Sequence, residues 1–334
     1  MVKFIVRRLL MLIPILIGLS ILVFLWIRAL PGGPAQALLG ERATPETVAQ
    51  IERSYGLNKP IYVQYWLYVK RVGSGDFGTS TSSRRAVTDE LGERFAATIE
   101  LAIAAMIFAI VFGIPLGFMG AKNYGGPLDN LSLVLTLIGV SLPIFFLAIL
   151  LKYSFAVKLG LLPTVGRISP LIDIPHPTNF YLLDALLAGD MNAFWDVSKH
   201  LILPAIALGS IPLAIIARIT RASVLDVQNE DYVRTARAKG LAPRVVDERH
   251  IMRNALLPIV TIIGLQTGLL LSGAVLTETV FAWPGLGTWL VDAIDQRNYP
   301  VLQGGILFVS IIFVLINLLV DVAYAFINPR IRVS

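Results

Sequence analysis

A short basic stretch between two long apolar segments sets the orientation of this chain. Residues Asp231 to Leu241 read Asp-Tyr-Val-Arg-Thr-Ala-Arg-Ala-Lys-Gly-Leu, and the basic character continues up to Asn254-Ala255-Leu256-Leu257-Pro258. The cations that crowd this connection are Arg234, Arg237, Lys239, Arg244, Arg249 and Arg253. In a membrane-spanning protein, such a concentration of arginine and lysine marks the cytoplasmic side.

The same stretch predicts a short helix with a defined end. Residues 233–238 are good helix formers, and Gly240 can end the helix because glycine adopts a positive φ without strain. Pro243 disfavours any continuation. A second segment then leads into the next apolar run. The alternative interpretation is a solvated basic loop that only fixes the orientation of the chain.

The composition places the chain in a membrane. Of its 334 residues, 56% are hydrophobic and only 15% are charged, whereas a soluble chain has about a quarter charged residues. The mean hydropathy is +0.73. We therefore expect an all-α, polytopic membrane protein. The net charge of +6 does not indicate nucleic-acid binding, because the cations cluster beside apolar runs as orientation charges do.

Several kinds of chemistry are excluded or disfavoured by the residue inventory. The sequence has no cysteine, so disulfides, thiolate catalysis and cysteine-ligated metals are excluded. His176, His200 and His250 are far apart in the sequence, and we expect no metal site built on them. The phosphate-binding pattern GxxxxGK[ST] is missing, so the chain cannot hydrolyse ATP by that machinery.

Six apolar runs are long enough to cross a bilayer, for which about 20 residues suffice. They cover residues 9–30, 98–120, 131–153, 201–219, 257–276 and 305–327. Pro143 should break or bend the third run. A cleaved signal peptide ending near Ala35-x-Ala37 is the alternative for the first run, but signal segments are shorter, about 7–15 residues. We therefore expect an uncleaved first span.

The charge pattern orients these spans and divides the chain. Six spans place both termini in the cytoplasm, in agreement with Lys3, Arg7 and Arg8 at one end and Arg330 and Arg332 at the other. The expected parts are a cytoplasmic N-terminus and first span (1–30), an extracytoplasmic helical region (31–97), a five-helix transmembrane domain (98–327) and a cytoplasmic tail (328–334). The transmembrane domain includes an outer loop (160–199) and the basic loop (221–256).

The extracytoplasmic region shows two helix signals. Thr44 can cap a helix over residues 45–55, with Glu46 in its first turn, before Gly56 stops it. Residues 60–72 predict a second helix with aromatic side chains on one face. We expect these aromatic residues to pack against the membrane domain rather than to recognise a ligand.

A few polar residues near or within the spans are candidates for a translocation path. They are Gln266, Ser272, Glu278, Asn317 and Asp321. An intramembrane carboxylate such as Asp321 normally faces protein or water. Asp321 can therefore line a path or pair with an arginine near the cytoplasmic surface, and its place close to the helix end favours the pair. Gln266 and Ser272 can equally be hydrogen-bonding contacts between helices.

The order of the sequence motifs resembles the dipeptide, oligopeptide and nickel branch of ABC importer permeases over essentially the whole chain. The segments that carry the resemblance are Arg7-Arg8-Leu9, Leu30-Pro31-Gly32-x-Pro34, Gly56-Leu57-Asn58-Lys59-Pro60, Gly75-Asp76-Phe77-Gly78, Thr235 to Leu241, Thr277 to Gly287 and Asn328 to Arg332. Arg234-Thr235-Ala236 stands where the wider family has Glu-Ala-Ala, and Gly240 keeps the family glycine. The loop at 167–199 most resembles that of dipeptide permeases.

The resemblance implies a role as one half of a heterodimeric pore in the bacterial inner membrane. The other half would be a homologous second permease, with two ATPase subunits beneath it and an extracytoplasmic peptide-binding protein above. ATP and magnesium would bind the ATPase subunits, and no cofactor would bind this chain. The residues that would couple the chain to the ATPases are Asp231, Tyr232, Arg234, Thr235, Ala236, Arg237, Ala238, Lys239, Gly240 and Leu241. We expect Ala236 and Ala238 at the contact. The substrate would be a dipeptide or short peptide, with glutathione, a nickel chelate or haem as alternatives.

Three other classes of membrane protein fit the sequence less well. A secondary transporter or channel would more often show repeated halves with broken helices, and no such repeat is visible. A membrane-embedded enzyme would need paired catalytic residues within its spans, where the sequence offers one clear aspartate and no histidine. A structural scaffold would need no ATPase, so copurification of a neighbouring ATPase separates an importer from all three classes.

Overall fold

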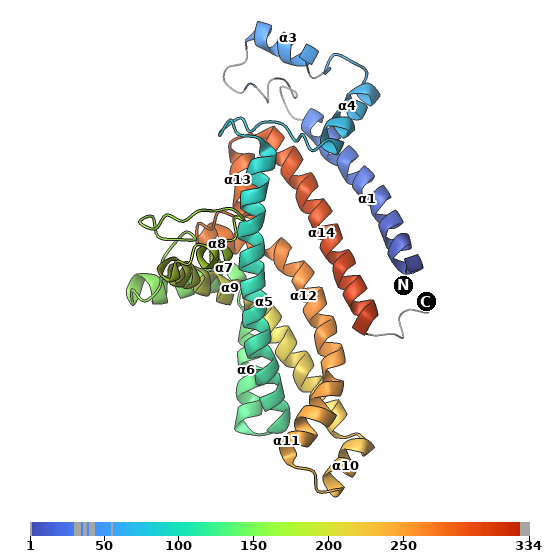
Figure 1. Ribbon diagram of the computed structural model, residues 1–334, viewed down its shortest axis with the longest axis vertical. Helices are drawn as coiled ribbons and strands as arrows, with labels where there is room; N and C mark the ends of the chain where they lie inside the picture. Colours follow the sequence, from blue (N-terminus) through green and yellow to red (C-terminus); the bar gives the residue numbers. More distant parts are fainter. Residues whose placement is uncertain (1, 30–34, 36–38, 40–43, 55, 328–334) are drawn as a thin grey trace. The chain divides into compact units, whose positions relative to one another are not determined.

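The computed structural model describes the backbone of residues 2–29, 35, 39, 44–54 and 56–327. Side chains are described for these residues except 2–9, 12, 27, 51, 54, 271–273, 317 and 319–327. The described residues form helices joined by turns and loops (Figure 1). The prediction of an all-α protein is confirmed.

The chain divides into two compact units. The first contains Met1–Ala97 and Pro284–Leu318, and the second contains Thr98–Trp283 and Leu319–Ser334. Helices of the first unit are α1 (Val2–Ala29), α3 (Pro45–Ser54), α4 (Ile61–Gly73), α13 (Leu286–Asp295) and most of α14 (Tyr299–Ile327). Helices of the second are most of α5 (Val87–Lys122), then α6 (Pro127–Ser141), α7 (Ile144–Leu151), α8 (Tyr181–Leu187), α9 (Met191–Gln228), α10 (Asp231–Ala238), α11 (Pro243–Val245) and α12 (Arg253–Val280). Two π-helical segments, Lys152–Lys158 and Val246–Met252, continue α7 and α11.

Among the described residues, four helical stretches are long and apolar enough to span a membrane: Val87–Lys122, Met191–Gln228, Pro243–Leu270 and Tyr299–Ile316. A fifth span forms if the pair Pro127–Ser141 and Ile144–Lys158 is counted as one, and the two members of this pair are bent by 106°. The break at Pro143 agrees with the sequence prediction. Within α1 the apolar stretch Ile13–Trp26 is shorter, so the count of six spans stays a prediction.

Two helices begin earlier than their predicted spans. Helix α5 begins at Val87, so the end of the expected extracytoplasmic region and the second apolar run form one helix. Helix α9 begins at Met191, which shortens the expected outer loop at 160–199. Asp190 explains this second start, because its carboxylate accepts hydrogen bonds from the backbone N–H groups of Asn192 at 2.9 Å and Ala193 at 3.0 Å. An N-cap of this kind is worth about 1 kcal/mol.

The core of the first unit is built around two aromatic clusters. Trp289 of α13 packs with Leu91, Leu302 and other buried apolar residues, and its Nε1–H donates to Glu90 Oε2 at 2.8 Å. Phe24 of α1 packs against Tyr65 and Tyr68 of α4, with ring centroids 5.2 Å and 5.6 Å apart. The predicted packing of the aromatic face of residues 60–72 is therefore confirmed for Tyr65, whereas Tyr62 and Trp66 of the same face are exposed. The α3 cap is confirmed as well, because Thr47 N–H donates to Thr44 Oγ1 at 3.3 Å.

Helix α9 is central to the second unit, where it packs against α6, α7, α8 and α12. It also meets α5 at glycines that bring the two backbones together. A Cβ atom added at Gly117 would overlap the carbonyl of Ala217, and one added at Gly209 would lie 2.6 Å from the carbonyl oxygen of Ala105. Small residues allow this close approach, which is a main source of helix association in lipid.

We predict that Gly117→Val destabilises the protein by more than the cost of replacing a helical glycine elsewhere. The added side chain must push α5 away from α9, and overpacking of this kind costs about 1–3 kcal/mol or more. Gly92→Val in the same helix is the matched control, because no atom lies within 4 Å of a Cβ there. Thermal unfolding of the purified variants tests this, and equal unfolding midpoints would contradict the close contact.

Candidate functional site

The basic loop contains the predicted short helix, α10, which ends as the sequence indicates. Gly240 has φ +76°, and its N–H donates to the carbonyl of Arg237 at 2.9 Å. The N–H of Leu241 donates to the carbonyl of Ala236 at 3.4 Å. These two bonds form the Schellman arrangement, which satisfies carbonyl groups at a helix end and favours glycine at the residue with positive φ.

Helix α10 has a buried face and an exposed face. Val233 is fully buried and Ala236 is only 4% exposed. The exposed residues of the stretch are Asp231, Tyr232, Arg234, Thr235, Arg237, Ala238, Lys239, Gly240 and Leu241. The Ala236 side chain packs inside the loop in this structure, so its expected contact with a partner stays a prediction. Ala238 lies on the exposed face, as expected.

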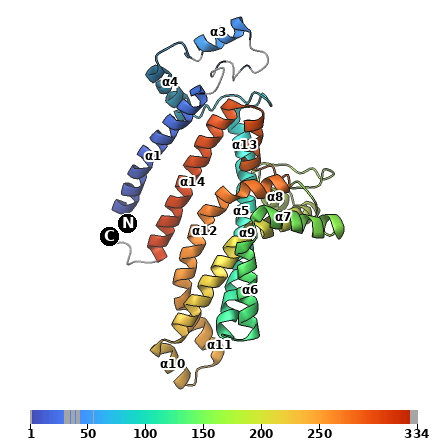
Figure 2. The ribbon, with the colours of Figure 1, turned by 180° about the vertical axis from the view of Figure 1, so that it is seen from behind.

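Helix α10 is joined to the start of α12 through Tyr232, at the edge of its buried face. Asn254 Nδ2 donates to Tyr232 Oη at 2.9 Å and to the carbonyl of His250 at 3.0 Å, and the Tyr232 hydroxyl donates to that same carbonyl at 3.4 Å. Ile251, in the π-helical segment between them, is fully buried. Figure 2 shows α10 and α11 together beyond the ends of α9 and α12. The loop is thus a packed element rather than an extended linker.

Ion pairs join this region to α5 and α6. Arg221 of α9 makes a two-pronged contact with Asp129, with Nε–Oδ1 at 2.6 Å and Nη2–Oδ2 at 2.8 Å. Asp129 is 2% exposed and also accepts from the N–H of Gly125 at 2.9 Å. Lys122 Nζ lies 2.9 Å from Asp247 Oδ1. Planar, paired contacts of the Arg221 kind are geometrically specific as well as strong.

The charge that remains on the outside of the loop is mostly positive. Arg244 pairs with Glu248 at 2.7 Å, and Arg234 lies 3.5 Å from Asp231. Arg237 and Lys239 are exposed on α10 itself. Exposed pairs such as these contribute about 0–1 kcal/mol, so their main effect is on the electrostatic field that a partner meets.

The candidate path residues are only partly described by the structure. Gln266 of α12 is 6% exposed, and Glu278 is fully buried. Thr98 Oγ1 donates to Glu278 Oε1 at 2.6 Å, which joins the start of the second apolar run to the end of α12. The side chains of Ser272, Asn317 and Asp321 lie outside the described residues. A path through these residues stays a prediction.

A buried ion pair joins α5 to the loop that precedes α8 and α9, and it was not predicted from the sequence. Arg167 Nη2 lies 2.5 Å from Glu100 Oε2, and both side chains are about 5% exposed. Glu100 Oε1 accepts from the N–H of Leu182 at 2.8 Å, and the Arg167 guanidinium stacks 3.8 Å from the Tyr181 ring centroid. These contacts hold the loop before α9 against α5.

The C-terminal end of α12 also contacts this loop and the π-helical segment after α7. The carbonyl of Phe281 accepts from the N–H of Gly166 at 2.9 Å, and that of Val280 accepts from Lys152 Nζ at 2.7 Å. Trp283 is fully buried, with its ring centroid 5.5 Å from the Arg167 guanidinium carbon. The motif Thr277 to Gly287 therefore contributes backbone acceptors and a buried aromatic ring.

With this fold and loop in place, the sequence family defines the class of protein. Residues 113–333 match the family described as binding-protein-dependent transport system inner membrane component, and residues 1–102 match its N-terminal counterpart. The chain belongs to this family. It is a multi-pass inner-membrane component of ABC transporters and is not itself the ATPase.

Individual relatives cover the whole chain. It is 50% identical over 332 residues to the dipeptide transport system permease protein DppB of Alkalihalophilus pseudofirmus, covering 99% of this chain and 100% of the relative. It is 48% identical over 336 residues to the protein of the same name in Escherichia coli K12, covering 99% of each. The glutathione transport system permease protein GsiC of Salmonella typhimurium is 43% identical over 332 residues, again covering 99% of each.

A solved structure shares the fold at low sequence identity. A chain of the MetNI methionine ABC transporter in an inward-facing conformation superposes with a TM-score of 0.53 and 17% identity, covering 71% of this chain and 96% of that chain. This likeness concerns the fold alone and agrees with the family assignment.

We predict that Gly240→Val opens the end of α10, whereas Gly240→Asn is better tolerated. No atom lies within 4 Å of a Cβ at Gly240, so the cost comes from the positive φ, on the order of 1–2 kcal/mol for a β-branched residue, and asparagine tolerates this conformation better. Amide hydrogen exchange over residues 231–241 should become faster in Gly240→Val. Equal exchange in both variants would show that the Schellman end does not hold the loop.

Proposed function

We propose that the chain is the permease subunit of an ATP-driven importer that takes up dipeptides or other short peptides. The observation that carries this proposal is 48–50% identity along essentially the whole chain to permeases of dipeptide transport systems. The glutathione relative is also similar along its full length but less so, at 43%. Glutathione, a nickel chelate or haem is therefore the alternative substrate of the same machinery.

The partners follow from the same proposal. A peptide-binding protein delivers substrate from outside, and two separate ATPase subunits bind ATP and magnesium. A homologous second permease completes a heterodimeric pore. Residues 31–97 and the loop at 160–199 then face the outside, and both termini and the basic loop face the cytoplasm, as the charge pattern predicts. No cofactor is assigned to this chain.

The geometry of the loop supports a coupling role. The exposed face of α10, with Arg234, Arg237 and Ala238, docks onto an ATPase subunit. Hydrogen bonds among Tyr232, His250 and Asn254 hold the helix to the start of α12. Packed elements of this kind move as bodies rather than deform continuously. Displacement of α10 when the ATPases close is therefore passed to α12 and, through the Lys122–Asp247 pair, to α5.

The translocation path is assigned to polar residues of α12 and α14. Gln266, Ser272, Glu278, Asn317 and Asp321 remain the proposed lining residues. Their carbonyl, hydroxyl and carboxylate groups suit a substrate with both a peptide backbone and a charged amino group. Glu278 is enclosed in the present conformation, so it would meet substrate only in another state of the transport cycle.

Substrate choice is tested by uptake in cells that lack this chain and in the same cells supplied with it. We expect uptake of a labelled dipeptide only when the chain and its partners are present, with strong competition by unlabelled dipeptide and weak competition by glutathione. Equal competition by glutathione would move the assignment to the alternative substrate. Unchanged dipeptide uptake in cells without the chain would contradict the proposed function, provided that no second peptide importer operates in them.

A further inference from the structure

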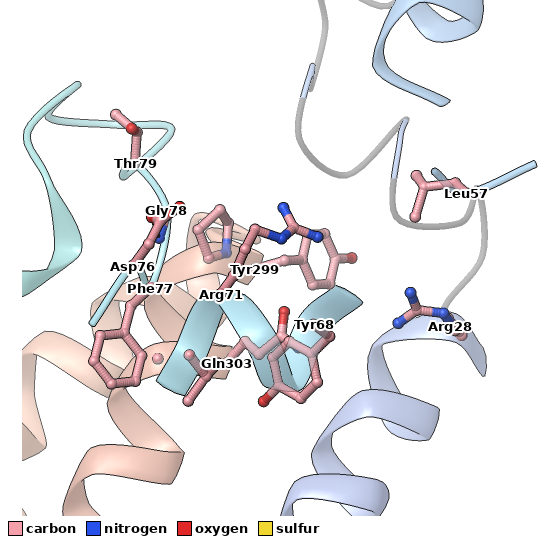
Figure 3. A pocket seen from close by; sticks show the side chains of 13 residues that line it. Arg28, Leu57, Tyr68, Arg71, Asp76, Phe77, Gly78, Thr79, Tyr299 and Gln303 are labelled. Carbon is pink, nitrogen blue, oxygen red and sulfur yellow. Dashed lines mark hydrogen bonds between the residues drawn. The ribbon is translucent and has the colours of Figure 1, made fainter. Parts of the chain in front are cut away.

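The first unit contains a pocket that the transport proposal does not use (Figure 3). It has a volume of about 200 Å³ and lies between the end of α1, helix α4, the turn at residues 76–79 and the start of α14. Its polar lining residues are Arg28, Tyr68, Arg71, Asp76, Thr79, Tyr299 and Gln303. In Figure 3, Tyr68 lies between Gln303 and Arg28.

Tyr68 is a buried donor without a hydrogen-bonding partner in the described part of the chain. Its side chain is 7% exposed, and its hydroxyl makes no hydrogen bond there. Burial raises the pKa of Tyr68 to about 12, so the hydroxyl keeps its proton at physiological pH. The side chain of Gln303 lies near this hydroxyl and opposes the rise in its pKa. Because a buried polar group without a well-formed hydrogen bond is costly, the hydroxyl is suited to donate to a molecule bound in the pocket.

The charge of the lining favours an anion. Arg28 donates through Nε to Gln64 Oε1 at 2.9 Å and through Nη1 to the carbonyl of Phe24 at 3.2 Å. Both partners are neutral, so they leave the positive charge of Arg28 in place. Asp76 is the acidic residue among the lining residues, and its Oδ1 accepts from the N–H of Gly78 at 2.9 Å. Among the described lining residues, Arg28 and Arg71 are cationic and Asp76 is anionic, so their side chains have a formal excess of one positive charge.

Exposed apolar and aromatic side chains lie on the helices that form the pocket, as expected for a surface that contacts lipid. Arg28 follows the apolar stretch Ile13–Trp26 by two residues, which places it at the level where head groups meet the hydrocarbon core. Leu22 and Trp26 of α1 are exposed, and so are Tyr62 and Trp66 of α4. Tryptophan and tyrosine side chains are enriched at this level of a bilayer, and basic residues beside it attract anionic lipids.

We infer that this pocket binds the phosphate group of an anionic phospholipid. Arg28 and the Tyr68 hydroxyl donate to the phosphate oxygens, and Arg71 adds its positive charge. The acyl chains lie along the exposed apolar side chains of α1, such as Leu22. A phosphodiester supplies one negative charge and several acceptor oxygens, which match the net charge and the donors of the lining. A carboxylate offered by a soluble protein would lack the chains that this apolar strip accommodates.

The test is binding of phosphatidylglycerol to the purified transporter complex, measured by native mass spectrometry. The double variant Arg28→Gln/Arg71→Gln should bind this lipid about tenfold more weakly or worse, as expected when charge-assisted hydrogen bonds are lost. Arg53→Gln/Lys70→Gln is the charge-matched control, because both of these residues are exposed and neither lines the pocket. Tyr68→Phe removes only the hydroxyl and should weaken binding of the lipid severalfold. If the double variant does not fold, this single variant decides the outcome.

Several results would overturn the inference. Equal weakening in the control would show general attraction between charges. Unchanged binding in both Tyr68→Phe and a folded double variant would show that the pocket holds no lipid. Inorganic phosphate or glycerophosphoglycerol binding as tightly as phosphatidylglycerol would identify a free-anion site. Unchanged lipid binding together with lost docking of the extracytoplasmic binding protein would make the pocket a protein contact. None of these results depends on which substrate the transporter carries.

Discussion

The close contact between α5 and α9 is the constraint on which the second unit depends. Apolar side chains gain little by leaving lipid for one another, so helices in a membrane associate where their backbones can approach. Gly117 permits that approach from α5 and Gly209 permits it from α9. Since α9 also packs against α6, α7, α8 and α12, its position against α5 fixes the frame that carries the basic loop.

The basic loop is attached to that frame by polar contacts rather than by apolar burial alone. The Arg221–Asp129 pair joins α9 to α6, and the Lys122–Asp247 pair joins α5 to the π-helical segment before α12. Asp129 is buried, so removal of Arg221 would leave a buried carboxylate without its charged partner, which is costly. The Lys122–Asp247 pair is partly exposed and contributes about 0–1 kcal/mol. These ion pairs fix the position of the loop relative to α5 and α6. A fixed position is needed if the loop is to pass movement from a soluble partner to the spans. The exposed face of α10 is left for that partner.

Features that depend on a few neighbouring residues could be predicted from the sequence, whereas contacts between distant residues could not. Gly240 and Pro143 act on their own backbone, so the end of α10 and the break after α6 could be predicted from a few residues. The pairs Arg167–Glu100 and Arg221–Asp129 join residues 67 and 92 positions apart, and no local spacing reveals them. The close approach of Gly117 to α9 also joins distant parts of the chain and was not predicted. The inward position of Ala236 also needed the structure, since composition cannot tell the two faces of an eight-residue helix apart.

The central claim is that the exposed face of α10 couples this chain to ATP hydrolysis. The most direct measurement is ATP hydrolysis by the reconstituted transporter with and without substrate-loaded binding protein, in variants at Ala238. Ala238 is exposed, so Ala238→Trp should leave the chain folded and inserted yet abolish the stimulation, while Ala238→Ser should retain it. Full stimulation in Ala238→Trp would contradict the claim and leave the loop with the role of fixing orientation alone.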